Sequence, residues 1–259
     1  MSTEPIKQYT VTNFQAAGMC NGQGEMPLAG LIDVLIQTAT GHANKAGFGY
    51  AGLIEHNCSW VLSRVVAKIN SLPVINSTYI LDTWVENVGR LMTNRNFEMR
   101  DAATGNVMIE AKTVWCAINL DTRRPADLPA TFPGLLEVIN PRKVNIELGP
   151  KPRPVREVTD PIDNYRFRFS DIDLNRHVNS CRYVELIADH YGMEFYDHNR
   201  VAELDIVFHH EALFNQQSYL KVATDGDTAS IELAGDSDIT FCLARLRYER
   251  RSQPIENNF

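Results

Sequence analysis

Residues 27–49 read PLAGLIDVLIQTATGHANKAGFG, and this stretch decides the fold. Pro27 suits the first turn of a helix, and Gly47 and Gly49 suit its ending. Between them, apolar residues recur at intervals of three and four, the spacing that gives a helix one apolar face: Leu28, Leu31, Ile32, Leu35 and Ala39. An amphipathic helix needs an apolar surface to cover that face, so the segments that follow it determine the fold class.

Those segments resemble strands. Four of them are rich in β-branched and aromatic residues, and Thr104-Gly105-Asn106 suits a turn between the last two. They are residues 60–69, 78–88, 91–99 and 107–120. One long helix followed by consecutive antiparallel strands is typical of an α+β fold.

The second half of the chain repeats this order. The spacing of four residues predicts a second amphipathic helix near the start of this half: Val184, Ile187, Ala188 and Tyr191. Gly192 lies near the end of that helix. Asp225-Gly226 and Gly235-Asp236 suit hairpin turns between the strand-like segments 203–208, 218–223, 229–233 and 239–248. The sequence therefore predicts an α+β fold in which a curved sheet could cover one helix in each half.

Proline marks the expected boundary between the halves. Eight of the twelve prolines fall between Pro125 and Pro161. Proline lacks a backbone donor and restricts the residue before it, so this stretch is unsuited to one helix or a central strand. We expect an N-terminal domain at 1–130, a Pro-rich interdomain linker at 131–162 and a C-terminal domain at 163–259.

Composition narrows the function classes. The net charge of −7 argues against a nucleic-acid-binding protein. No apolar run approaches the length of about 20 residues that spans a bilayer, and the polar start lacks a secretory signal. For a complete chain this predicts a cytoplasmic protein without stable membrane insertion. Neither a disulfide framework nor a metal site is expected from five scattered cysteines without a Cys-x-x-Cys pair: Cys20, Cys58, Cys116, Cys181 and Cys242.

The densest polar cluster is SDIDLNRHVN at residues 170–179, between a predicted strand at 165–169 and the helix that starts near Asn179. Asp173, Asn175 and His177 alternate in it, so in an extended segment their side chains would share one face. A carboxylate or imidazole can move protons near neutral pH, and backbone N–H groups at a helix start can face an oxyanion. This pattern suits acyl-transfer chemistry. Taken alone, such a pattern more often marks helix capping and turns than catalysis, and it lacks the glycine and the distal glutamate of a calcium loop.

A resemblance separates these readings. DIDLNRHVNSCRYVE, residues 171–185, resembles the active-site signature of plant and bacterial acyl-ACP thioesterases. Three further stretches resemble the same family in the same order: residues 35–47, residues 60–65, and residues 115–125 with Leu128-Pro129. The resemblance implies two tandem hotdog domains, each a curved antiparallel sheet around one long helix. It also implies chemistry confined to the second half, with an acyl-binding or structural role for the first.

Carried over by position, the catalytic residues of the family fall on Asp173, Asn175, His177 and Glu211. Where many plant members have a cysteine, this chain has Ala212, so a thiol nucleophile is not expected there. We interpret Cys181 as a small packing residue. His209 and His210 are interpreted as strand residues or electrostatic modifiers, and His42 as a packing or hydrogen-bonding residue of the first helix.

The resemblance implies hydrolysis of a fatty acyl-acyl carrier protein (ACP) to free fatty acid and holo-ACP, which ends fatty acid elongation. No metal or organic cofactor is expected, because a thioester is already activated. Three alternatives stay open: an acyl-CoA thioesterase, a hotdog dehydratase and a noncatalytic acyl-binding module. The expected partner is acyl-ACP, with a monomer or a homodimer both feasible. ACP is acidic, so we expect a local basic patch drawn from Arg123, Arg124, Arg142, Lys143, Arg176 and Arg182.

Overall fold

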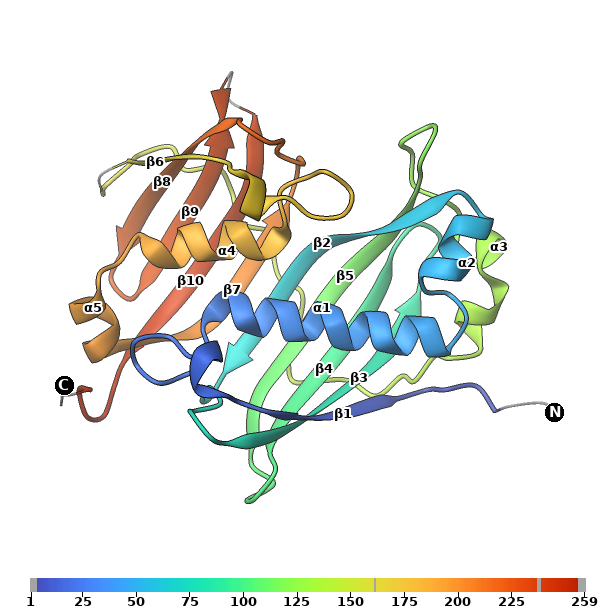
Figure 1. Ribbon diagram of the computed structural model, residues 1–259, viewed down its shortest axis with the longest axis horizontal. Helices are drawn as coiled ribbons and strands as arrows, with labels where there is room; N and C mark the ends of the chain where they lie inside the picture. The colour runs from blue at the N-terminus through green and yellow to red at the C-terminus, as the bar shows by residue number, and fades with distance from the viewer. Residues whose placement is uncertain (1–3, 161, 237–238, 256–259) are drawn as a thin grey trace. The chain divides into compact units, whose positions relative to one another are not determined.

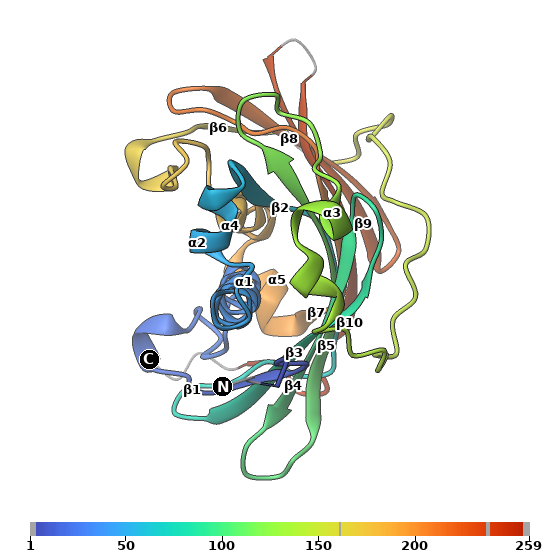
Figure 2. The same cartoon turned by 90° about the vertical axis from the view of Figure 1, so that its right-hand side faces the viewer.

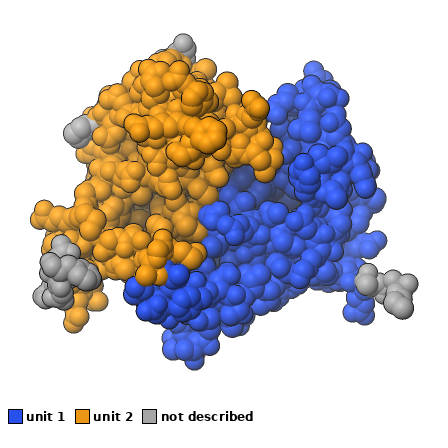
Figure 3. Space-filling view, viewed as in Figure 1, with its two compact units in different colours: residues 1–16, 33–147 blue, residues 17–32, 148–259 orange. Residues whose placement is uncertain are grey.

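The structure is a computed structural model that describes residues 4–160, 162–236 and 239–255. Contacts divide the chain into two compact units, coloured separately in Figure 3. Unit 1 comprises residues 1–16 and 33–147, and unit 2 comprises residues 17–32 and 148–259. Each unit is described by itself below.

The strands of unit 1 form an antiparallel sheet in the order β1-β3-β4-β5-β2. Large side chains such as Leu81, Trp84 and Phe97 are almost completely buried between this sheet and its surroundings. The strands are β1 (Tyr9–Phe14), β2 (Cys58–Ile69), β3 (Thr78–Val88), β4 (Thr93–Asp101) and β5 (Val107–Asn119). The four strand segments expected in the first half are thus confirmed, with ends that shift by a few residues.

Helix α1 (Leu28–Lys45) lies across the concave face of the unit 1 sheet, as Figures 1 and 2 show. Its range confirms the helix predicted from the spacing of apolar residues. Gly47 has a φ of 86°, in the left-handed region that glycine adopts without strain, which explains why the helix ends just before it. A short helix, α2 (Tyr50–Glu55), follows and leads into β2.

The proline-rich stretch differs from the expected linker. Helix α3 (Leu128–Thr131) and the 3₁₀ turn η2 (Pro133–Leu136) fold onto unit 1, where Phe132, Leu135 and Val138 are buried in its core. Residues 131–147 therefore group with unit 1, and residues 148–162 group with unit 2. Residues 17–32, expected in the N-terminal domain, also group with unit 2. Proline prevented regular strands here, but apolar side chains between the prolines still pack.

The strands of unit 2 pair in antiparallel fashion, in the order β7-β10-β9-β8-β6. Between β8 and β9 the chain turns at Gly226, whose φ is 62°, which confirms the hairpin predicted at Asp225-Gly226. The strands are β6 (Asp163–Arg166), β7 (Asn199–Phe208), β8 (Gln217–Asp225), β9 (Thr228–Gly235) and β10 (Thr240–Arg250).

Helix α4 (Ser180–Asp189) packs against these strands, and its residues Tyr183, Val184 and Ile187 are buried. It ends at Asp189, before the Tyr191 included in the expected helix. A short helix, α5 (Met193–His198), connects it to β7. Each unit thus has a helix against an antiparallel sheet, and the predicted α+β fold is confirmed. Among the described residues, no helix is long and apolar enough to cross a membrane.

Candidate active site

The segment between β6 and α4 forms a closed loop. Asp173 Oδ1 accepts hydrogen bonds from the backbone N–H of Asn175 at 2.8 Å and of His177 at 3.2 Å. The Asp173 N–H donates to the carbonyl of His177 at 2.8 Å, and Arg176 adopts a left-handed φ of 64° between them. The segment is therefore a turn and not the extended segment in which the three side chains would share one face, because a short carboxylate that binds nearby N–H groups stabilises a turn.

A second segment brings Glu211 to this loop. The backbone N–H of Val178 donates to the carbonyl of Ala212 at 2.8 Å, and His177 forms a β-bridge with Leu213. As a result, His177 Nε2 and Glu211 Oε2 lie 3.4 Å apart, with side chains that are 23% and 40% exposed. An imidazole and a carboxylate, 34 positions apart in the sequence, thus meet where water can reach both.

Asn175 and Asp173 differ in how they take part. Asp173 is half-buried and ties the loop together, whereas Asn175 is exposed and joins the loop through its backbone N–H. The structure therefore places all four residues carried over from the family on two adjacent segments. Among them, the side chains of His177 and Glu211 contact each other.

The start of helix α4 is capped rather than open. Asn179 Oδ1 accepts a hydrogen bond from the Cys181 N–H at 2.9 Å, and the Asn179 N–H donates to the carbonyl of Asp171 at 2.8 Å. This N–H of Cys181 is therefore engaged, although we expected open N–H groups that could face an oxyanion. Asn179 acts as a helix cap.

Tyr183 contacts the backbone of the segment that carries Glu211, and it was not identified from the sequence. Its hydroxyl accepts a hydrogen bond from the Ala212 N–H at 2.9 Å, directly beside Glu211. The ring is buried, and burial, together with the nearby Glu211 and Asp173 carboxylates, raises the pKa of this phenol well above its usual range. Tyr183 is therefore a protonated positioning residue. The sequence could have indicated Tyr183 through its position on the same face of helix α4 as Val184 and Ile187, which are also buried.

Asp171 and Arg182 form a second, structural cluster. The Asp171 carboxylate accepts hydrogen bonds from the Arg168 N–H at 2.6 Å and the Tyr165 hydroxyl at 3.0 Å, and lies 3.3 Å from Arg182 Nε. Arg182 also pairs with Glu185 at 2.7 Å. Arg182, a candidate for carrier docking, is thus engaged within unit 2, while Arg176 is exposed on the closed loop.

The remaining candidate groups have structural surroundings. Cys181 is half-buried. Ala212, which stands where many plant members of the family have a cysteine, is buried. His209 and His210 lie just beyond β7, and burial, Lys151 and His210 lower the pKa of His209. His210 contacts the carbonyl of Thr240 through Nδ1 at 2.9 Å. Within the part of the chain that the structure describes, no three His, Cys, Asp or Glu side chains group as metal ligands would.

Family profiles match both halves of this chain. Residues 7–133 match the acyl-ACP thioesterase N-terminal domain, and residues 156–241 match the acyl-ACP thioesterase C-terminal domain. The palmitoyl-acyl carrier protein thioesterase, chloroplastic, of Arabidopsis thaliana is 26% identical over 229 residues, which cover 82% of this chain and 54% of that protein. Oleoyl-acyl carrier protein thioesterase 2, chloroplastic, of the same plant is 24% identical over a stretch that covers 70% of this chain and 53% of that protein. The chain spans about half the length of these curated relatives.

Solved structures match over nearly the whole chain. An acyl-ACP thioesterase from Bacteroides thetaiotaomicron has a TM-score of 0.84 at 28% identity, covering 94% of this chain and 98% of the other. The 12:0-ACP thioesterase from Umbellularia californica, at 15% identity, shares the fold with a TM-score of 0.83 and covers 95% and 98%. Together with a helix against antiparallel strands in each unit, these matches confirm the predicted tandem hotdog fold.

Proposed function

The chain belongs to the acyl-ACP thioesterase family, and from this premise we propose that it hydrolyses the thioester of a fatty acyl group carried on ACP. Water adds to the thioester carbonyl, the carbon–sulfur bond breaks, and the products are a free fatty acid and the thiol of holo-ACP. This reaction would end fatty acid elongation. The observation that carries the proposal is the 3.4 Å approach of His177 Nε2 to Glu211 Oε2 beside the loop closed by Asp173.

Each residue has a role that follows from its surroundings. Glu211 and Asp173 position water and accept its proton, because both are carboxylates on the two adjacent segments and neither is fully buried. His177 contacts Glu211 and passes a proton to the departing sulfur, since an imidazole exchanges protons near neutral pH. Asn175 is exposed beside them and orients the thioester carbonyl or a catalytic partner through its amide.

Substitution of the histidine tests these roles. His177→Ala lowers kcat by about 10² to 10⁴-fold, the usual contribution of a proton-transfer group. His210→Ala is the matched control, because His210 lies one residue before Glu211 and its ring contacts a backbone carbonyl. Wild-type kcat for His177→Ala, or an equal loss for His210→Ala, would remove the histidine from the mechanism. Glu211→Gln tests the carboxylate in the same way, and full activity across pH would reject its role.

Direct attack by Asp173 is the competing chemistry. The carboxylate oxygen would displace the thiol and leave a mixed anhydride, which water then hydrolyses. A single turnover in heavy-oxygen water, combined with trapping of an acyl-enzyme, separates the two routes. Water attack puts the label only in the fatty acid. Hydrolysis of the anhydride at its acyl carbon gives the same result, whereas hydrolysis at the Asp173 carbon labels the protein. Label in the Asp173 carboxylate therefore rules out water attack, and trapping of an acyl-enzyme by hydroxylamine covers the other case.

The carrier needs its own test, because the same chemistry would hydrolyse acyl-CoA. We compare kcat/KM for one acyl chain on ACP and on CoA, with rising salt. If exposed Arg176 contributes to docking, Arg176→Glu raises KM for acyl-ACP and spares a small thioester, and the effect weakens as salt screens charges over about 10 Å at 0.1 M. A higher kcat/KM on CoA favours the acyl-CoA thioesterase. Tight acyl-ACP binding without turnover favours a binding module.

A further inference from the structure

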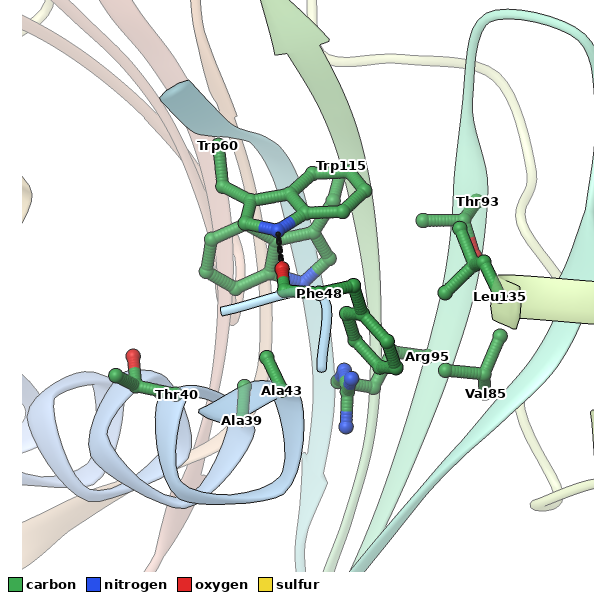
Figure 4. Close-up of a pocket in the computed structure, with 10 residues that line it drawn as sticks. All are labelled: Ala39, Thr40, Ala43, Phe48, Trp60, Val85, Thr93, Arg95, Trp115 and Leu135. Atoms are coloured by element: carbon green, nitrogen blue, oxygen red, sulfur yellow. Dashed lines mark hydrogen bonds between the residues drawn. The ribbon is translucent and has the colours of Figure 1, made fainter. Parts of the chain in front are cut away.

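Unit 1 contains a cavity of about 50 Å³ between helix α1 and the sheet. Figure 4 shows its walls, which include the ring of Phe48 and the indoles of Trp60 and Trp115. The other walls are Ala39, Thr40, Ala43, Val85, Thr93, Arg95 and Leu135. This volume offers roughly three to five water-sized positions. A cavity of this size can hold the terminal functional group of a ligand and the first few atoms of the chain that carries that group.

Arg95 is the charged residue among these mostly apolar walls. It comes from β4, is 5% exposed, and uses Nη1 to donate to His42 Nδ1 at 2.8 Å and to Thr83 Oγ1 at 3.2 Å. His42 is neutral, because its Nε2–H donates to the carbonyl of Ile6 at 2.6 Å and Nδ1 is left as the acceptor. Burial and Arg95 also lower the pKa of His42 to about 4. The guanidinium therefore has two neutral partners.

The buried carboxylate of Glu86 is engaged elsewhere. Glu86 pairs with Lys112 Nζ at 2.8 Å and accepts a hydrogen bond from Asn96 Nδ2 at 2.8 Å. Among residues 4–160, 162–236 and 239–255, no carboxylate forms an ion pair with Arg95, and its side-chain hydrogen bonds to His42 and Thr83 both run from Nη1. A guanidinium stays charged in proteins, and a buried charge is costly unless it is paired. Burial lowers the pKa of Arg95 to about 9, which reflects that cost.

We propose that this cavity binds a carboxylate carried on an apolar stem, with the Arg95 fork against the carboxylate and the two indoles against the stem. A carboxylate presents two oxygens and one charge, which match one guanidinium fork, whereas a phosphate brings more charge than one cation offsets. Two molecules have this chemistry: a free fatty acid, and an acyl group with a second carboxylate at its far end. The second source rests on the proposed function, and the first does not.

Tryptophan fluorescence tests the site directly. Trp60 and Trp115 line the cavity, while Trp84 donates its N–H to the carbonyl of Arg142 outside it. The full chain is titrated with decanoate and with decanol, which share a stem length and differ in charge. We expect decanoate to bind at least about tenfold more tightly, as a charge-assisted contact should give. Equal affinities would overturn the proposal without any variant.

Variants assign the preference to one side chain. Arg95→Met should abolish the preference for decanoate, and Arg95→Lys should keep part of it, because the charge remains without the fork. Replacement of an unpaired buried charge by an apolar side chain of similar size is compatible with folding. The matched control is Arg100→Met on the same strand, since Arg100 pairs with Asp82 and lies outside the cavity walls. A preference that survives Arg95→Met, or that Arg100→Met also removes, contradicts the assignment.

Turnover then separates the two sources. If the site reads the substrate, a carboxylate at the far end of a decanoyl chain on ACP raises kcat/KM by about tenfold or more, and Arg95→Met removes this gain. If it reads free fatty acid, decanoate inhibits the wild-type protein and inhibits Arg95→Met much less. A chain that hydrolyses no acyl-ACP refutes the proposed function, and the decanoate-to-decanol ratio still decides whether the cavity binds carboxylates.

Discussion

The closed loop at Asp173 allows charge and hydrogen bonding to be separated by two substitutions. Both backbone N–H groups that close the loop, from Asn175 and His177, end on the same oxygen, Oδ1. Asp173→Asn keeps an oxygen acceptor of the same shape and removes the charge. Asp173→Ala removes both. The two variants should therefore differ in stability even if neither is active.

The expected loss of stability for each variant follows from the hydrogen bonds that it removes. Each N–H that loses its acceptor in a part-exposed loop costs about 0.5–1.5 kcal/mol, so Asp173→Ala should weaken the closed loop by about 1–3 kcal/mol. This is about a 5- to 150-fold change in the ratio of closed to open loop. Asp173→Asn keeps both acceptors and should cost about half as much or less, because only the charge assistance is lost. Its kcat should still fall by about 10²-fold or more if the carboxylate moves a proton.

Denaturant unfolding and steady-state hydrolysis of one acyl-ACP measure both effects. We expect Asp173→Asn to unfold near the wild-type midpoint with little activity, and Asp173→Ala to be both less stable and inactive. Near-wild-type kcat for Asp173→Asn would refute the chemical role of the carboxylate. Wild-type stability for Asp173→Ala, with unchanged amide exchange at Asn175 and His177, would refute its role in closing the loop.

Three further predictions concern residues outside the proposed chemistry. Tyr183→Phe leaves the buried N–H of Ala212 without an acceptor, so it should lower both the free energy of unfolding, by about 1–3 kcal/mol, and kcat. Tyr196→Phe, which removes a hydroxyl that donates to a backbone carbonyl, should lower stability alone; equal kcat for the two variants would contradict a positioning role. Burial lowers the pKa of His42 to about 4, so the unfolded chain takes up this proton first and stability is lost as pH falls from about 6.5 to 4. The loss attributable to this group is about 3 kcal/mol, measured as the difference between wild type and His42→Gln. Cys181→Ser should keep most activity and its resistance to thiol-blocking reagents, and inactivity would reveal a thiol in the mechanism.

The fold could be predicted where periodicity is strong. Helix α1 and strand β3 were predicted to within about a residue, because long runs of apolar residues repeat at one period. Strand β1 was missed, since it is short and its exposed face carries Thr10 and Thr12 among half-buried neighbours. The packing of residues 131–147 was missed for a different reason. Proline excludes regular structure locally, but it does not prevent Phe132 and Leu135 from being buried.

The site could be predicted only as a set of residue types. The resemblance indicated Asp173, His177 and Glu211, but their alternation places them on one face only in an extended segment, and here a carboxylate closes a turn. Side-chain hydrogen bonds to nearby N–H groups compete with extended structure, and periodicity does not register this competition. Contacts between Tyr183 and Ala212 join residues 29 positions apart, and those between His42 and Arg95 join residues 53 apart. Such pairs depend on strand register and helix placement.

The backbone around the site explains how exposed residues can hold a fixed geometry. Long polar side chains at a surface ordinarily lose their contacts to water and to conformational entropy. Here the His177 backbone is fixed by the Asp173 carboxylate and by a bridge to Leu213, and the segment after Glu211 is fixed by the buried Tyr183. The side chains that contact each other therefore have anchored backbones and open tips. The proposed hydrolysis needs both properties, because the reacting water must enter from solvent and must meet a base whose position is already set.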